Sequence, residues 1–172
     1  MARLRSQAKL GYYPTPPGVV ADIKQAIAPL SEPGTYRCLD TCCGAGEALA
    51  QLTDGLGNQE SIVETYGVEL DEGRYEVATQ KLDKVLWADA LNEITILSKA
   101  FSLLWLNPPY DWEDSRRLEA QFLEMHLRYL APRGWLVFII PHQALKSVEK
   151  ALAKLGDLQI YAFPELDFQA FK

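Results

Sequence analysis

The chain has 172 residues, of which 48% are hydrophobic and 23% are charged, and this composition predicts one globular domain. Its formal net charge of −6 excludes a protein that holds nucleic acid by bulk positive charge alone, although a local basic patch remains compatible with it. The longest apolar run, Trp135 to Ile140, is too short to span a membrane, and no signal-peptide apolar stretch follows the basic N-terminal residues. We therefore expect a cytoplasmic protein.

The three cysteines, Cys38, Cys42 and Cys43, are clustered in the sequence, which argues against an extracellular disulfide framework. Adjacent cysteines point in different directions, and neither histidine is near them in sequence, so we expect no metal site. The cysteines are instead interpreted as packing residues of a loop. His126 is expected at a helix surface, and His142 at the rim of the predicted pocket.

Hydrophobic periodicity alternates between strands and helices from Pro17 onward, which predicts a three-layer α/β domain with a mostly parallel sheet of at least six strands. The predicted helices are 19–30, 47–52, 73–82, 115–131 and 145–155. The predicted strands are 37–41, 65–70, 85–88, 101–106, 135–140 and 158–163. Asp114 or Ser115 is expected to cap the fourth helix, and Pro132 to Gly134 to end it.

Polar and glycine-rich segments follow the predicted strands. Because the carboxyl ends of parallel strands meet at one edge of such a sheet, we expect these segments to form a ligand site there. They are Asp40 to Gly46, Glu69 to Asp71, Asp89, Asn107 to Tyr110, and Pro141-His142.

The loop Asp40-Thr-Cys-Cys-Gly44-Ala-Gly46 joins a strand to a helix, so a cofactor can approach its backbone at a helix N-terminus. Glu69, after the next strand, can accept hydrogen bonds from ribose hydroxyls. A dinucleotide-binding loop would carry glycine or alanine where Leu49 stands, which disfavours NAD. The alternative ligand is S-adenosylmethionine, and Asp89 could accept from its adenine amino group.

The segment Asn107-Pro108-Pro109-Tyr110 ends the most apolar predicted strand, and we predict that it is the catalytic segment. An aromatic or amide amino group is a poor nucleophile, so its hydrogens must be accepted while its lone pair faces the methyl group. The Asn107 side-chain oxygen and the Pro108 carbonyl can accept these hydrogens, and Tyr110 offers a stacking face. The sequence thus predicts methyl transfer to an amino group, which depends mainly on alignment.

These segments resemble motifs I to IV of class I S-adenosylmethionine-dependent methyltransferases, in the amino-group branch that includes the N6-adenine DNA methyltransferases. Tyr13-Pro14-Thr15-Pro16-Pro17 is similar to the Phe-x-Thr-Pro-Pro segment of that family, which implies contact with the methionine part of the cofactor. The resemblance implies a Rossmann-like fold and S-adenosylmethionine as cofactor. Its implied cofactor-binding residues are Tyr13, Thr15, Pro16, Asp40, Cys42, Gly44, Gly46, Glu69, Leu70, Asp89, Ala90 and Asn107.

The resemblance assigns the catalytic role to Asn107 through Tyr110, and Tyr110, Trp112 and Arg116 are expected to contact the substrate. The expected domain organisation is a single catalytic domain over residues 1–172, with the N-terminal motif inside 1–16 and no separate target-recognition domain. The chain stops about where the seventh strand of this fold would begin, so the sheet is expected to be incomplete or the sequence a fragment.

The expected substrate is adenine N6 in DNA, with RNA adenine and protein glutamine amide as alternatives. A further alternative is a cofactor-binding subunit that needs a partner chain, such as a target-recognition subunit. Basic residues do not decide between these partners. Arg3, Arg5 and Lys9 form an N-terminal group, and Lys146, Lys150 and Lys154 form one stripe along a helix; either group could contact phosphates.

Overall fold

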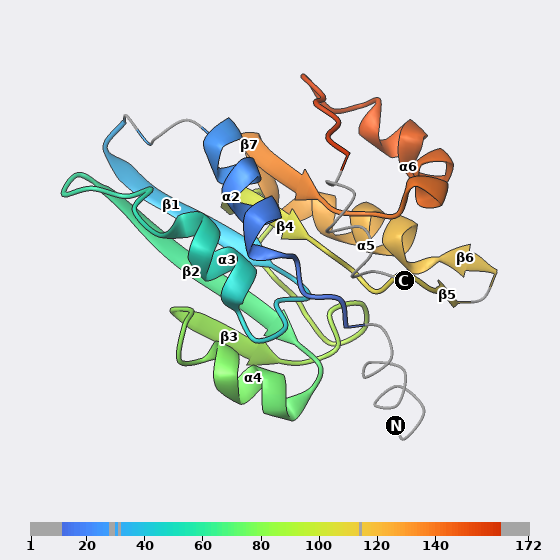
Figure 1. The fold of residues 1–172 in the computed structure, drawn as a ribbon, viewed down its shortest axis with the longest axis horizontal. Coiled ribbons are helices and arrows are strands. Elements are labelled where there is room, and N and C mark those ends of the chain that lie inside the picture. Colours follow the sequence, from blue (N-terminus) through green and yellow to red (C-terminus); the bar gives the residue numbers. More distant parts are fainter. Residues whose placement is uncertain (1–11, 28–29, 31, 114, 163–172) are drawn as a thin grey trace.

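Five parallel strands form the central sheet, in the order β3-β2-β1-β4-β7 (Figure 1). The computed structural model describes residues 12–27, 30, 32–113 and 115–162, and the N-terminal basic group therefore lies outside the described residues. The strands are β1 (Gly34–Asp40), β2 (Ser61–Glu69), β3 (Lys84–Trp87), β4 (Phe101–Leu106) and β7 (Leu130–Phe138). β1 pairs with β2 on one side and with β4 on the other, so the strand order reverses beside β1. This is where ligands bind in open α/β sheets.

β4 lies inside the sheet between β1 and β7, and its side chains are buried in alternation on two faces. Leu103 and Trp105 belong to one hydrophobic cluster, whereas Leu104 and Leu106 belong to another. Such a strand, covered on both sides, needs an almost continuous apolar sequence. The sequence prediction of this strand therefore matches its observed bounds.

Helices cover both faces of the sheet, which confirms the predicted Rossmann-like α/β fold. One face packs against α2 (Pro17–Ala26), α3 (Glu47–Thr53) and α4 (Glu72–Ala78). The other packs against α5 (Leu118–His126) and α6 (Leu145–Leu152), with short 3₁₀ turns η1 (Leu127–Tyr129) and η2 (His142–Ala144) beside them. Among the described residues, the longest apolar helix falls short of the length needed to cross a membrane.

The expected sixth strand is not formed in its described part, so the sheet has five strands there. Leu158 to Ala162 adopt no regular secondary structure, and Phe163 lies outside the described residues. Leu158, Ile160 and Tyr161 are at least half exposed. An alternating apolar pattern becomes a strand only when a neighbouring strand satisfies its backbone, and here none of the described strands does.

The segment before α5 differs from the prediction because a small hairpin replaces the first turn of the expected helix. β5 (Trp112–Glu113) pairs antiparallel with β6 (Arg116–Arg117), and Ser115 between them has a left-handed φ of 65°. Asp114 lies outside the described residues. The helix starts at Leu118, so Ser115 does not cap it, and Pro132 to Gly134 lie inside β7 rather than ending the helix.

His126 is fully buried, which corrects its expected surface position. Its Nε2 lies 2.9 Å from the Ala90 carbonyl oxygen, and its Nδ1 lies 3.4 Å from the Thr41 hydroxyl. Burial lowers the pKa of His126, so the ring is neutral and needs such partners. The histidine therefore ties α5 to the loops that follow β1 and β3.

Candidate active site

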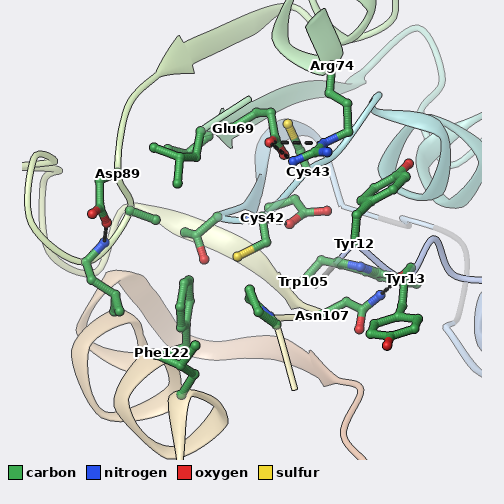
Figure 2. Close-up of a pocket in the computed structure, with 18 of the residues that line it drawn as sticks. Tyr12, Tyr13, Cys42, Cys43, Glu69, Arg74, Asp89, Trp105, Asn107 and Phe122 are labelled. Atoms are coloured by element: carbon green, nitrogen blue, oxygen red, sulfur yellow. Dashed lines mark hydrogen bonds and ion pairs between the residues drawn. The ribbon is translucent and has the colours of Figure 1, made fainter. Parts of the chain in front are cut away.

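A cavity of about 190 Å³ lies at the carboxyl ends of the strands, where the sequence analysis expects a ligand site. Figure 2 shows side chains from several loops turned towards this space. The predicted residues that line it are Tyr13, Thr15, Asp40, Cys42, Glu69, Leu70, Asp89, Ala90, Asn107, Pro109 and Trp112. The fold thus brings together residues that are widely separated in the sequence.

The loop between β1 and α3 turns through two glycines with positive φ angles, 56° at Gly44 and 83° at Gly46. Gly46 is the N-cap of α3. A Cβ atom at Gly44 would lie 2.4 Å from the ring of Tyr12, so the tyrosine packs directly on the glycine backbone. Both glycines are therefore needed for the turn, and Gly44 also for close packing of the N-terminal segment.

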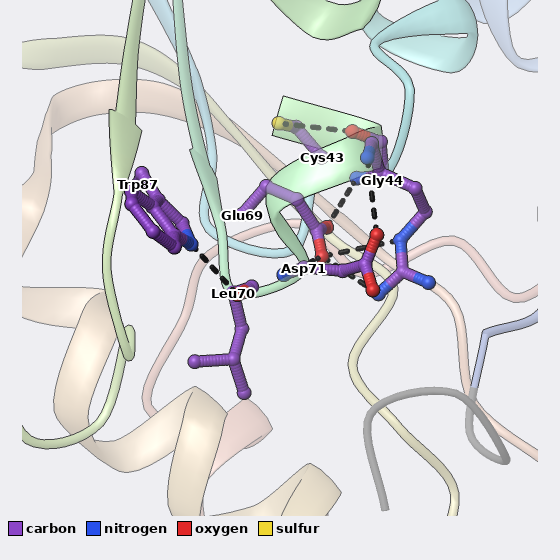
Figure 3. Close-up of polar contacts among 7 residues, drawn as sticks. Cys43, Gly44, Glu69, Leu70, Asp71 and Trp87 are labelled. Atoms are coloured by element: carbon purple, nitrogen blue, oxygen red, sulfur yellow. Dashed lines mark hydrogen bonds and ion pairs between the residues drawn. The ribbon is translucent and has the colours of Figure 1, made fainter. Parts of the chain in front are cut away.

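Glu69, at the end of β2, is almost fully buried and accepts four hydrogen bonds (Figure 3). Its Oε1 accepts from the Asp71 backbone N–H and from two nitrogens of Arg74, at 2.7 and 3.1 Å for the guanidinium. Within the described part of the chain, its Oε2 accepts only from the Gly44 N–H, at 2.9 Å. The carboxylate is held rigidly, and Oε2 is the oxygen with remaining capacity for a ligand hydroxyl.

Asp40 ends β1 and is 3% exposed, with its Oδ1 accepting from the Cys42 N–H. Burial, together with the nearby charge of Glu69, raises the pKa of Asp40 to about 7. A positively charged ligand beside these two carboxylates would favour their ionised forms. The two buried carboxylates therefore favour binding of a cation at this site.

Among the charged side chains of the described lining, acidic ones predominate: Asp40, Glu47, Glu69, Asp89, Asp111 and Glu113. Arg74 is the one basic side chain among the described lining residues, and it is paired with Glu69. Such a lining disfavours a polyphosphate and suits a cofactor with a sulfonium and an ammonium group. The residues present thus fit S-adenosylmethionine better than a dinucleotide.

Asp89, which also lines the cavity, has hydrogen-bond partners of its own. Asp89 accepts from the Leu91 N–H at 2.8 Å and from the Asn92 side chain at 3.0 Å. Burial, with the charges of Asp40 and Glu69, raises the pKa of Cys42 far above its usual value. Cys42 therefore remains a neutral thiol, which excludes it as a nucleophile.

Asn107 follows β4 and is anchored to the N-terminal segment (Figure 2). Its Nδ2 donates to the Tyr13 carbonyl oxygen at 2.8 Å and to the Thr15 hydroxyl at 3.1 Å. Both amide hydrogens are therefore used, which fixes the orientation of the side chain. The amide oxygen is left as an acceptor of defined direction.

Tyr110 forms a hydrogen bond with Asn107 that was not predicted from the sequence. Its hydroxyl donates to Asn107 Oδ1 at 2.8 Å, and its ring stacks on Tyr13 with centroids 5.6 Å apart and planes 8° apart. Burial, with the negative charge of Glu119, raises the pKa of Tyr110, so the hydroxyl stays protonated. In this structure Tyr110 occupies the acceptor that the expected substrate would use.

Other predicted residues lie next to the cavity rather than in its lining. Pro16 is the N-cap of α2, and Pro108 is buried. Arg116 lines a second cavity, of which Trp112 is also a wall. Trp112 is 59% exposed and thus marks the boundary between the two cavities.

The lining residues that were missed from the sequence include Tyr12, Arg74 and Phe122. The Arg74 guanidinium lies 4.5 Å from the centroid of the Tyr12 ring, so these two residues link the N-terminal segment to Glu69. Tyr12 could have been found from its position beside the Thr-Pro-Pro segment. Arg74 and Phe122 carried no signal, since each fits an ordinary amphipathic helix.

Solved structures with this fold include several methyltransferases. A Listeria monocytogenes protein described as a class I S-adenosylmethionine-dependent methyltransferase is 19% identical, with a TM-score of 0.69 over 81% of this chain and 51% of that one. A type I restriction-modification methyltransferase subunit from Streptococcus thermophilus is 20% identical, with a TM-score of 0.64 over 84% and 39% of the two chains. A Thiobacillus denitrificans methyltransferase in complex with S-adenosyl-L-homocysteine is 14% identical, with a TM-score of 0.51 over 86% and 62%.

This chain therefore spans about half the length of the Listeria protein. At these identities the likeness concerns the fold alone. A sequence family gives the finer relationship, because its match extends over residues 1–172. The chain belongs to DUF6094, an uncharacterised methyltransferase family.

Proposed function

We propose that this chain transfers a methyl group from S-adenosylmethionine to an exocyclic amino group, adenine N6 of DNA. The observation that carries the proposal is the fixed amide of Asn107, whose two hydrogens are bound to Tyr13 and Thr15. Its oxygen is thereby an oriented acceptor at the carboxyl end of β4, beside an acidic cavity. An amino group held there presents one hydrogen to Asn107.

The proposed cofactor contacts use residues that the fold already brings together. Glu69 Oε2 would accept from a ribose hydroxyl, and Asp89 would accept from the adenine amino group. Asp40 would lie near the cationic methionine part, which Tyr13 and Thr15 would also contact. S-adenosylmethionine supplies an electrophilic methyl group on a sulfonium.

The catalytic contribution of the chain is positioning. Asn107 Oδ1 and the Pro108 carbonyl accept the two amino hydrogens, which directs the nitrogen lone pair towards the methyl group. Alignment of nitrogen, methyl carbon and sulfur can supply about 7–11 kcal/mol of the barrier. The stacked rings of Tyr13 and Tyr110 offer a flat surface for a planar base that has left its helix.

Adenine in DNA is favoured by the N-terminal segment from Tyr13 to Pro17, whose resemblance is to the N6-adenine branch. The restriction-modification subunit among the similar folds is compatible with this substrate. We further propose that residues 1–172 act as a single catalytic domain in the cytoplasm. Target recognition would then come from a separate subunit or domain.

The test is transfer of a tritiated methyl group to DNA that lacks N6-methyladenine, with RNA and a pool of glutamine-containing peptides as parallel substrates. We expect label in N6-methyladenine after enzymatic digestion of the DNA. Label in RNA or in peptide instead would show that one of these is the substrate, and would contradict the proposal of DNA. Calorimetric binding of S-adenosylmethionine without any transfer would indicate a cofactor-binding subunit that needs a partner.

The Tyr110 hydroxyl competes with the substrate, and its removal is expected to favour substrate binding. In Tyr110→Phe the ring still stacks on Tyr13, but Asn107 Oδ1 is free. A neutral hydrogen bond contributes about 1 kcal/mol, so we expect KM for DNA to fall about fivefold with kcat nearly unchanged. Steady-state kinetics measure this. Tyr110→Ala, which also removes the stacking ring, should instead lower kcat/KM by at least about 10-fold.

A further inference from the structure

A second cavity of about 410 Å³ adjoins the first and shares Trp112 with it. The β5-β6 hairpin forms one side, and the start of α6 with the preceding η2 turn forms the other. The polar side chains of its lining include Arg116, Arg117, Glu124, Gln143, Lys146 and Ser147. We call this second cavity the hairpin cleft.

The hairpin cleft has the opposite charge to the first cavity. Three basic side chains, Arg116, Arg117 and Lys146, line it together with one acidic side chain, Glu124. Arg116 bonds to Glu124 at 2.7 Å, but both side chains are more than half exposed, so water weakens this pair. Among the described residues, no carboxylate lies within ion-pair distance of Lys146. The cleft therefore suits an anion.

Arg117 is held in place by a buried carboxylate and an aromatic ring. Its Nη1 donates to Glu119 Oε1 at 3.0 Å, and its guanidinium lies 4.9 Å from the centroid of the Trp112 ring. Glu119 is fully buried, and among the described residues its Oε2 has no hydrogen-bond partner. Glu119 cancels part of the charge of Arg117, so the net attraction for an anion rests mainly on Arg116 and Lys146.

We propose that the hairpin cleft binds a backbone phosphate of the DNA strand next to the target adenine. This inference rests on the function proposed above, and it adds where the DNA strand would lie on the protein surface. With the phosphate at Arg116 and Lys146, and the base on the other side of Trp112, the strand would pass over the exposed indole ring. The side-chain amide of Gln143 adds a donor that suits phosphate oxygens.

Lys146 offers a cleaner test than either arginine. Replacing Arg117 would leave the charge of Glu119 buried and unpaired. Replacing Arg116 would leave Glu124 without its ion-pair partner in the cleft, so two charges would change in effect. Lys150, one turn further along α6, is exposed and lies outside the lining of the cleft. Lys146→Gln and Lys150→Gln therefore make a matched pair with the same loss of charge.

The experiment measures binding of a fluorescein-labelled, adenine-containing single-stranded DNA by anisotropy between 50 and 200 mM KCl, a range in which each phosphate contact changes the affinity measurably. The logarithm of the association constant falls linearly with the logarithm of the salt concentration. Loss of one phosphate contact makes this negative slope shallower by about 0.7 to 1. We expect this shallower slope for Lys146→Gln, with a higher KM for DNA methylation and an unchanged kcat. Lys150→Gln should keep the wild-type slope.

The outcomes separate this inference from the proposed function. If the wild type methylates DNA and both variants show its slope, the hairpin cleft does not bind phosphate, although the function stands. If the wild type binds S-adenosylmethionine but neither binds nor methylates DNA, the proposed substrate and this inference fall together. Calorimetric titration with S-adenosylmethionine should give the same affinity for all three proteins, which shows that the variants are folded.

Discussion

Replacing Asn107 with alanine is expected to lower the rate of methyl transfer at least about 1,000-fold, because one oriented acceptor and two anchoring hydrogen bonds are lost together. Loss of a preorganised hydrogen-bonding group costs about 100- to 1,000-fold in comparable sites. Release of the segment that carries Tyr13 and Thr15 adds misalignment of the reacting atoms. Single-turnover transfer of tritiated methyl groups measures the effect.

Two companion variants separate the acceptor from its anchors. Thr15→Val keeps the buried volume but removes one of the two acceptors of the Asn107 amide, so a fall of about 10-fold is expected. Asn107→Asp keeps an acceptor oxygen but loses both donors, and should lie between the alanine variant and the wild type. An Asn107→Ala protein that retained the wild-type rate would show that this side chain does not hold the amino group.

Replacing Asp40 with asparagine is expected to stabilise the protein without cofactor at pH 8, by about 2–4 kcal/mol in the free energy of unfolding. The folded-state pKa of Asp40 is raised to about 7 from 3.8. The folded state therefore favours the protonated carboxyl, and stability is lost as the pH rises through that range up to about 7. Asparagine cannot ionise, yet its side-chain oxygen still accepts from the Cys42 N–H.

The same variant is expected to bind S-adenosylmethionine at least about 10-fold more weakly, because a negative charge beside a cation is removed. Thermal unfolding between about pH 5 and 8, with and without S-adenosylmethionine, measures both effects. The difference in stability between variant and wild type should shrink as the pH falls. The exposed Asp22→Asn serves as a control and should show neither effect. A difference that does not change with pH would mean that Asp40 is ionised throughout.

Much of the fold was predictable because its central strands are buried on both faces. β4 shows this best, since an almost entirely apolar segment ended by two prolines has few alternatives to a buried strand. The positions of Asp40, Glu69 and Asn107 followed from parallel strands, whose carboxyl ends meet at one edge. The sequence motifs thus predicted which residues meet, although the roles of these residues remain predictions.

The errors arose where tertiary partners decide the structure. Leu158 to Ala162 carry a strand pattern, but none of the described strands pairs with them. His126 lies on a helix whose polar positions suggest solvent, yet its ring bonds to Thr41 and Ala90, which are remote in sequence. The bond between Tyr110 and Asn107 was missed because a motif shows which groups are present and does not reveal their partners in the absence of substrate.

That bond between Tyr110 and Asn107 bears on how the proposed reaction would end. An amino group enters with two hydrogens, but after methylation and loss of a proton only one remains. The product can therefore satisfy either Asn107 Oδ1 or the Pro108 carbonyl, and no longer both. The Tyr110 hydroxyl, covalently attached three residues away, is present at high local concentration and can take back the vacated oxygen. The Tyr110 hydroxyl would then compete with the product for this oxygen, and each turnover would return the site to the arrangement seen here.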